Sequence, residues 1–202
     1  MSIPHGVMFH HFCNNKKLAY GDGAYTEEKL HKLILNIKKN FIILEPQEFL
    51  YEIKKKTKDI ICFTFDDNLL SQYKIALNIL NHFNIKAFWF IYSSTFQNKR
   101  DYFEIYRRFR KNYFKNFNEF YLNFIETTKI QNYTINEINE SDIFKEIKNN
   151  YNFYTEKEII FRILRDKYLT NKDYKKTMNK MIKENNISYK TLSKNLWMNN
   201  KH

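Results

Sequence analysis

Short apolar runs alternate with longer segments of helical periodicity over the first 95 residues of the chain. Four of these runs are continuous enough to be strands buried on both faces, at 6–12, 41–44, 61–65 and 87–92. The segments between them predict three helices, at 27–40, 46–56 and 69–82. Because strands and helices alternate with short connections, the pattern predicts a parallel sheet of about four strands in an α/β fold.

The three helices carry end signals and apolar stripes. We expect Thr26 to cap the first helix and Pro46 to occupy the first position of the second. The stripe of the third helix is predicted to contain Leu69, Tyr73, Ala76, Leu77 and Leu80.

After residue 95 the pattern becomes helical throughout. Between Arg100 and Glu126, aromatic residues recur at helical spacing, which favours one core-packing helix over a basic amphipathic helix for a membrane or nucleic acid. These aromatic residues are Tyr106, Phe109, Tyr113, Phe117, Phe120 and Phe124. Residues 127–152 are rich in Asn and weakly periodic. Thr155 and Glu158 predict a capping box for a helix to about residue 168, and further helices are expected at 171–185 and 189–195. We expect 1–95 and 96–202 to form one domain.

The charge and the cysteines limit the classes of function. The formal net charge is +12 and the pI is about 9.5, which suits nucleic acid, an anionic membrane or an acidic glycan. The lysines are spread along the chain and accompany abundant Asn, Ile, Phe and Tyr, so codon bias explains the charge better and nucleic acid is not favoured as a partner. Cys13 and Cys62 predict no disulfide framework. No membrane span or signal segment is recognised, which predicts a cytoplasmic protein.

Polar side chains follow the predicted strands where each one ends. Asp66 and Asp67 come directly after the third run, His10 and His11 lie in the first, and Ser93 and Ser94 follow the fourth. Since parallel strands end at the same edge of a sheet, these groups are expected to converge, with at most one of the two histidines facing the site. In the alternative interpretation, Asp67 or Asn68 caps the following helix and Asp66 is only solvated.

The strand-end motifs resemble those of the polysaccharide deacetylases, the NodB-homology proteins of carbohydrate esterase family four. Thr64-Phe65-Asp66-Asp67 resembles the family's Thr-Phe-Asp-Asp-Gly signature, and Met8-Phe9-His10-His11 resembles the end of its first strand. Ala87-Phe88-Trp89-Phe90 is similar to a further strand of the family. Asn68 departs from the pattern, because the family has Gly there. The resemblance covers residues 1–95 and implies a partial (β/α) barrel of the NodB type, followed by an α-helical segment similar to a subgroup insertion.

By this resemblance, Asp66 is the general base and Asp67 a ligand of a divalent metal, with zinc expected. The activity implied is metal-dependent hydrolysis of N-acetyl groups on a carbohydrate. His10, His11, Asn68, Ser93 and Ser94 are expected to line the site. The family takes two more metal ligands from a His-Ser/Thr-x-x-His motif, which this sequence lacks.

The missing motif predicts weak or absent metal binding in this chain alone. In the subgroup, a stretch similar to Leu196-Trp197-Met198 comes shortly before that motif, so we expect a truncated N-terminal part that is inactive by itself. Three alternatives remain open at this point. The first is a non-catalytic fragment or partner-binding chain whose open strand edge pairs with a second chain that completes the barrel. The second is a Mg-dependent phosphotransfer domain that uses Asp66 and Asp67, although no phosphate-binding Gly loop is present. The third is a basic nucleic-acid binder.

Overall fold

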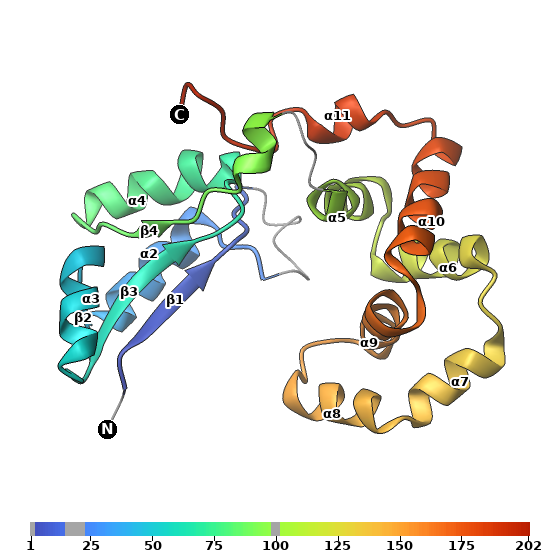
Figure 1. Ribbon diagram of the computed structural model, residues 1–202, viewed down its shortest axis with the longest axis horizontal. Coiled ribbons are helices and arrows are strands. Elements are labelled where there is room, and N and C mark those ends of the chain that lie inside the picture. Colours follow the sequence, from blue (N-terminus) through green and yellow to red (C-terminus); the bar gives the residue numbers. More distant parts are fainter. Residues whose placement is uncertain (1–2, 15–22, 98–101) are drawn as a thin grey trace. The chain divides into compact units, whose positions relative to one another are not determined.

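The computed structural model describes residues 3–14, 23–97 and 102–202. These residues form two compact units (Figure 1). One, here called the sheet unit, comprises 1–100 together with 193–202, and the other, the helical unit, comprises 101–192. The first boundary lies close to the expected change at residue 95, whereas residues 193–202 belong with the sheet. The expectation of a single domain stays a prediction.

The sheet unit is built on β3 (Ile60–Phe65), which is the central strand of four. β1 (His5–Phe9) runs parallel along one side of it, with Val7 opposite Phe63. β2 (Ile42–Ile43) and β4 (Phe88–Trp89) pair in parallel with the start and the end of β3. Both strands lie along the same edge of β3. There the N–H groups of Leu44 and Phe90 donate to the carbonyls of Ile61 and Phe65. The predicted α/β fold with four parallel strands and a helical segment is confirmed.

Helices cover both faces of this sheet. α2 (Glu27–Ile37) and α4 (Leu77–His82) pack against the face that carries Ile61, Phe63 and Phe65. α3 (Pro46–Lys54) places Phe49 against the opposite face, which carries Ile60 and Cys62. Successive side chains of a strand point to opposite faces, and β3 is apolar except at Thr64 because each face meets its own helical layer.

The predicted starts of the first two helices in the sheet unit are confirmed, although the helices end earlier than predicted, at Ile37 and Lys54. The Thr26 hydroxyl accepts the N–H of Lys29 at 3.2 Å, and Pro46 is the first residue of α3. Both devices act on N–H groups that the first turn of a helix leaves without a partner. The predicted strand 6–12 is shorter than expected, because the β1–β3 pairing ends at Phe9 opposite Phe65.

The predicted stripe of the helix 69–82 is wrong in part. Residues Gln72–Ala76 are π-helical, and the N–H of Leu77 donates to the carbonyl of Gln72, five residues back. The buried face is offset from the predicted stripe and follows Gln72, Ile75, Ala76, Ile79 and Leu80. Tyr73 and Leu77 are only half-buried, whereas Gln72, Ile75 and Ile79 are buried.

The described residues of the helical unit form seven helices between residues 102 and 193. The predicted single helix at 100–126 is wrong, because the chain turns after Tyr113 and a new helix begins beyond Asn116, whose side chain accepts the N–H of Glu119 at 3.0 Å. The Asn-rich stretch also contains two short helices. The bounds are α5 (Tyr102–Tyr113), α6 (Phe117–Thr128), α7 (Asn132–Glu140), α8 (Asp142–Asn150), α9 (Glu156–Ile163, continued by a π-helical turn at Leu164–Tyr168), α10 (Asn171–Glu184) and α11 (Tyr189–Ser193).

Aromatic rings form the core of the helical unit. Phe120, Phe124 and Phe161 are buried, and the centroid of the Phe161 ring lies 5.2 and 5.0 Å from the centroids of the other two. The predicted core packing of this stretch is thus confirmed for most of its aromatic residues, although Tyr113 is exposed. The capping box of Thr155 and Glu158 is confirmed as well.

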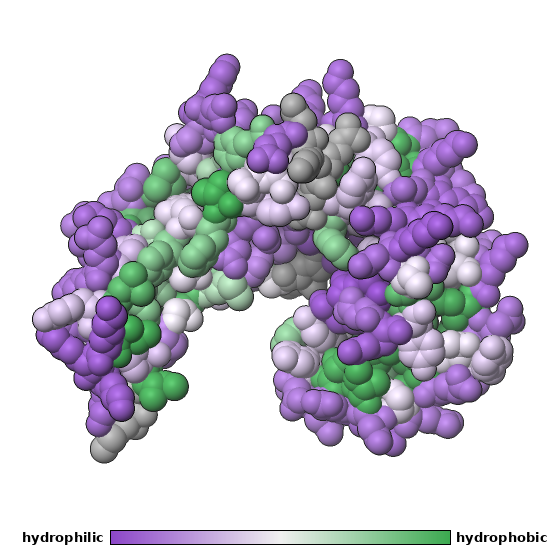
Figure 2. Space-filling view, viewed as in Figure 1, coloured by the Kyte–Doolittle hydropathy of each residue, from purple (hydrophilic) through white to green (hydrophobic). Residues whose placement is uncertain are grey.

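Some large apolar side chains remain on the surface of the sheet unit. Figure 2 shows hydrophobic groups along the face where β4 lies, and the exposed residues after this strand are Phe90, Ile91 and Tyr92. No helix within the described ranges is long and apolar enough to cross a bilayer. Neither cysteine is in a disulfide, and Cys62 is buried in β3.

Candidate active site at the strand ends

Two neighbouring strands end beside each other and bring three titratable side chains together. The β1–β3 ladder closes where the N–H of Asp66 donates to the carbonyl of Phe9 at 3.1 Å. Just beyond it, His10 Nε2 lies 3.8 Å from Asp66 Oδ2 and 3.7 Å from Asp67 Oδ2. All three side chains are partly exposed, so they are open to a ligand from solvent.

A left-handed turn allows two consecutive carboxylates to face one imidazole. Asp67 has φ 74° and Asn68 has φ 58°, both in the region that side-chain-bearing residues rarely adopt. Neighbouring side chains of an extended strand diverge, and this turn removes that constraint directly after β3. Asp and Asn tolerate the conformation better than most residues, so Asn can stand where glycine is the easier choice.

Asn68 fixes the turn from inside the protein. Its side chain is buried, and Nδ2 donates to Thr95 Oγ1 at 3.3 Å and to the carbonyl of Met198 at 3.5 Å. The backbone of the C-terminal segment runs antiparallel beside it, with Met198 donating to Asn68 and Leu70 to Leu196, both at 2.9 Å. The alternative in which Asn68 caps the following helix is wrong, because a cap would need an accepted bond at Oδ1 and that atom has no partner.

Buried polar atoms without partners gather at this turn. In the described part of the chain, Asp66 Oδ1, Asn68 Oδ1 and Gln72 Oε1 are all buried and accept no hydrogen bond. Nearly all buried polar atoms of native proteins are paired, so three such atoms within seven residues need an explanation. A water, ion or substrate at the strand ends would supply one.

The remaining candidate residues from the sequence lie around this centre. The ring centroid of His11 lies 5.9 Å from that of His10, and its carbonyl accepts the N–H of Tyr25. Ser93 and Ser94 begin a short 3-10 helix, Ser93–Gln97, after β4. Within that helix it is Thr95 whose hydroxyl accepts the amide of Asn68.

Two residues of the site, Thr95 and Gln72, were not predicted from the sequence. Thr95 follows the two serines that were singled out, and its role could have been suspected from its place after the fourth apolar run. Gln72 donates from Nε2 to the carbonyls of His10 at 2.8 Å and Asp66 at 2.5 Å. Gln72 lies four residues before Ala76, so helical spacing could have suggested its burial, but a polar residue was not included in the apolar stripe.

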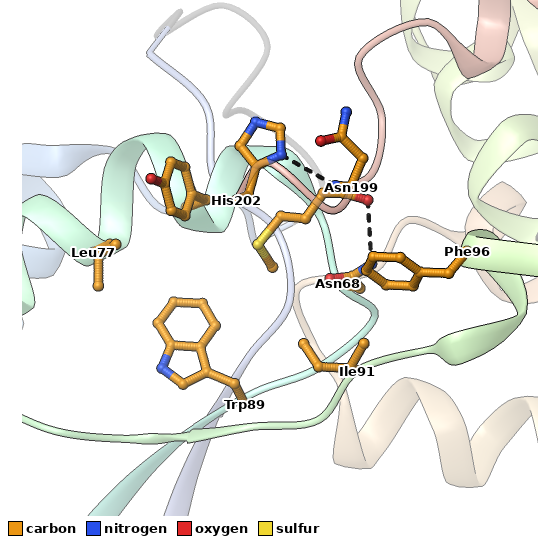
Figure 3. Close-up of a pocket in the computed structure, with 9 residues that line it drawn as sticks. Asn68, Leu77, Trp89, Ile91, Phe96, Asn199 and His202 are labelled. Carbon is orange, nitrogen blue, oxygen red and sulfur yellow. Dashed lines mark hydrogen bonds between the residues drawn. The ribbon is translucent and has the colours of Figure 1, made fainter.

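An apolar cavity of about 270 Å³ lies next to the turn within the sheet unit (Figure 3). Trp89 forms one wall and its ring stacks on Phe65, with the two centroids 4.4 Å apart. Phe96 and Ile91 lie opposite His202 and Asn199, whose N–H donates to His202 Nδ1 at 3.1 Å. The remaining lining residues are Asn68, Tyr73, Leu77 and Met198.

The described residues supply only part of a metal site. Carboxylate oxygen and imidazole nitrogen are suitable zinc donors, and Asp66 Oδ1 has no protein partner. Zinc sites in enzymes nevertheless use three protein ligands at about 2.0–2.2 Å. Within residues 3–14, 23–97 and 102–202, no group of three His, Cys, Asp or Glu side chains is arranged to hold a metal ion. The residues present therefore do not fit a complete zinc centre.

Comparisons with known proteins give two solved structures. No protein-family model matches the chain, and no curated protein does. The structure of IcaB from Ammonifex degensii is 16% identical over 45% of this chain and 39% of its own, with a TM-score of 0.37. A de-N-acetylase from Aggregatibacter actinomycetemcomitans is 15% identical over 48% of this chain and 40% of its own, with a TM-score of 0.39. The chain thus spans about two fifths of the length of these proteins.

Proposed function

We propose that this chain carries part of the active site of a de-N-acetylase-like protein that hydrolyses N-acetyl groups on a carbohydrate. The observation that carries the proposal is the position of His10 Nε2, within 3.8 Å of a carboxylate oxygen on each of Asp66 and Asp67. The resemblance of the two strand-end motifs to polysaccharide deacetylases supports it. In this proposal Asp66 is the base, Asp67 is a metal ligand and His10 lines the site.

The reaction needs a base where water meets the acetamide carbonyl. Water adds to that carbon, the C–N bond breaks, and acetate and the sugar amine are released. Asp66 suits proton abstraction because its carboxylate is partly exposed at the strand ends. A bound divalent metal would polarise the carbonyl and make water more acidic. His10, placed beside both carboxylates, supplies hydrogen-bonding capacity to either of them.

Metal affinity in this chain is expected to be weak, because the described residues lack a complete set of three ligands. Free imidazole has the same donor atom as histidine, so it can occupy vacant coordination positions. We therefore expect little acetate release with zinc alone, and an increase when imidazole is added. The dependence on Asp67 should persist under both conditions.

The test is to measure zinc or cobalt binding, and acetate release from N-acetylglucosamine oligosaccharides, with and without imidazole. Asp67→Ala should remove metal binding, whereas Asp66→Asn should retain it and lose acetate release. Asp142→Ala is the matched control, because Asp142 is a fully exposed carboxylate in the helical unit. Binding that is unchanged in Asp67→Ala, or acetate release that is unchanged in Asp66→Asn, would contradict the proposal.

A further inference from the structure

Gln72 connects the ends of the two strands that carry the candidate site. Its side chain is fully buried, and Nε2 donates to the carbonyl of His10 at 2.8 Å and to that of Asp66 at 2.5 Å. His10 follows β1 and Asp66 follows β3, so each carbonyl lies just beyond the last rung of the ladder. One side-chain amide therefore joins the two strand ends at the point where backbone hydrogen bonds between β1 and β3 stop.

The orientation of this amide follows from its partners. Both partners are carbonyl oxygens, which only accept hydrogen bonds, so the NH₂ group of Gln72 must face them. The reverse orientation would place Oε1 against two other oxygens. Oε1 instead points away from them and is buried without a partner.

Gln72 lies at the start of a π-helical turn. The carbonyl of Gln72 accepts the N–H of Leu77, five residues later. In a regular α-helix it would accept the N–H of Ala76, four residues later. Gln72 is buried on the same side of the segment as Ile75 and Ile79, which reach the core at helical spacing from it. π-helical turns of this kind occur often at functional sites.

We propose that Gln72 is the positioning residue of this site, and that its two hydrogen bonds set the separation between the His10 imidazole and the two carboxylates. Without them, the ends of β1 and β3 are joined only as far as the bond from Asp66 to Phe9. His10 and Asp66 would then vary in relative position, although neither contacts Gln72 through its own side chain. The consequence for metal binding rests on the function proposed above, whereas the geometric role does not.

The test replaces Gln72 by Met, which has a similar length and no donor, and by Asn, which keeps the amide but is one methylene shorter. Ile79→Val is the matched control, because it removes a buried methyl group from the same segment without touching the strand ends. The first readout is the nuclear Overhauser effect between the His10 ring and the Asp67 side chain in the metal-free protein. The second is cobalt affinity in the presence of imidazole.

The expected result is loss of the Overhauser effect in Gln72→Met and a fall in cobalt affinity of about 10–100-fold, as is typical when an outer-shell group is removed. Gln72→Asn should lie between Gln72→Met and the wild type, and Ile79→Val should change neither readout. An Overhauser effect that survives in both Gln72 variants would overturn the proposal. Equal losses in Ile79→Val would overturn it too, because they would follow from lowered stability alone. If the wild type binds no cobalt, the proposed function fails and the Overhauser effect still decides the role of Gln72.

Discussion

The two units of the molecule differ in how many of their buried polar side-chain atoms have a hydrogen-bond partner. Of the five buried side-chain atoms without a hydrogen-bond partner in the described residues, four belong to the sheet unit. They are Asp66 Oδ1, Asn68 Oδ1, Gln72 Oε1 and Trp197 Nε1, and all lie at or beside the turn after β3. The helical unit contributes only Asn123 Oδ1. Buried polar atoms of native proteins are nearly always paired, so their concentration at one turn sets this part of the sheet unit apart from the helical unit.

In the helical unit, polar groups are used to hold helices together. Glu104 accepts two bonds from Arg107 Nε, at 3.1 and 2.9 Å. The hydroxyl of Tyr106 donates to Asn179 Oδ1 at 2.7 Å, which links α5 to α10. The first pair lies within α5, and the second joins two helices. The difference teaches that candidate chemistry belongs to the sheet unit, and that the helical unit is organised for its own stability.

The largest expected effect comes from breaking the aromatic core of the helical unit. Phe120→Ala removes a ring that is fully buried against Phe124 and Phe161. The loss of buried area and the resulting cavity should cost about 3–5 kcal/mol in free energy of unfolding. Amide hydrogen exchange should report this loss in 102–192 only. Leu122→Ala on the same helix is the control, because Leu122 is exposed. An equal loss of protection in β1 and β3 would show that the two units unfold together.

A second prediction concerns stability in alkali. Burial raises the pKa of Tyr174 to about 12, against the opposing effect of Arg165 and Arg110. In the unfolded chain the hydroxyl has a pKa of about 10, so the unfolded state loses its proton first. The stabilising contribution is therefore complete below pH 10 and is lost as the pH rises through the folded pKa. The free energy of unfolding of the helical unit should fall by about 2–3 kcal/mol between pH 10 and pH 12.

Denaturant unfolding of wild type and Tyr174→Phe at pH 8 and pH 12 measures this loss. The variant should lose less stability in alkali, because its ring has no proton to release. Burial also raises the pKa of Tyr106, so part of the pH dependence should remain. The same pH dependence in wild type and variant would contradict the assignment to Tyr174.

The sequence predicted the elements more accurately than the contacts between them. Continuous apolar runs identified all four strands, but the expected burial on both faces is confirmed only for β3, because β1, β2 and β4 are mostly exposed or half-buried. The convergence of His10, Asp66 and Asp67 followed from the common edge of parallel strands. Gln72 was not predicted because a stripe chosen from apolar residues leaves out a buried polar side chain, although Gln72 stands at helical spacing from Ala76 and Leu80. The break at Asn116 was hidden by aromatic spacing that continues across it.

Two substitutions at Asn68 can separate the contribution of backbone strain to stability from that of the side-chain hydrogen bonds. Both Asn68→Gly and Asn68→Ala remove the bonds to Thr95 and Met198, and both remove the unpaired Oδ1. Only Ala keeps a Cβ at φ 58°, so it should be about 1–2 kcal/mol less stable than Gly in urea unfolding. Asn84 is the matched control, with φ 54° on an exposed side chain, and its Gly–Ala difference gives the backbone contribution by itself. If Ala equals Gly at position 68, the left-handed turn is not the native conformation there.

The smallest effects should come from one equivalent change in each unit. Thr26 caps α2 in the sheet unit and Thr155 caps α9 in the helical unit, each by accepting the N–H three residues ahead. Replacing either by Ala should cost about 1 kcal/mol, and replacing either by Ser should cost less, because the hydroxyl remains. Amide exchange should place each loss in the unit that contains the substitution, since local opening follows the cooperative unit. If Thr155→Ala lowered protection in α2, the helical unit would contribute to the stability of the sheet on which the candidate site is built.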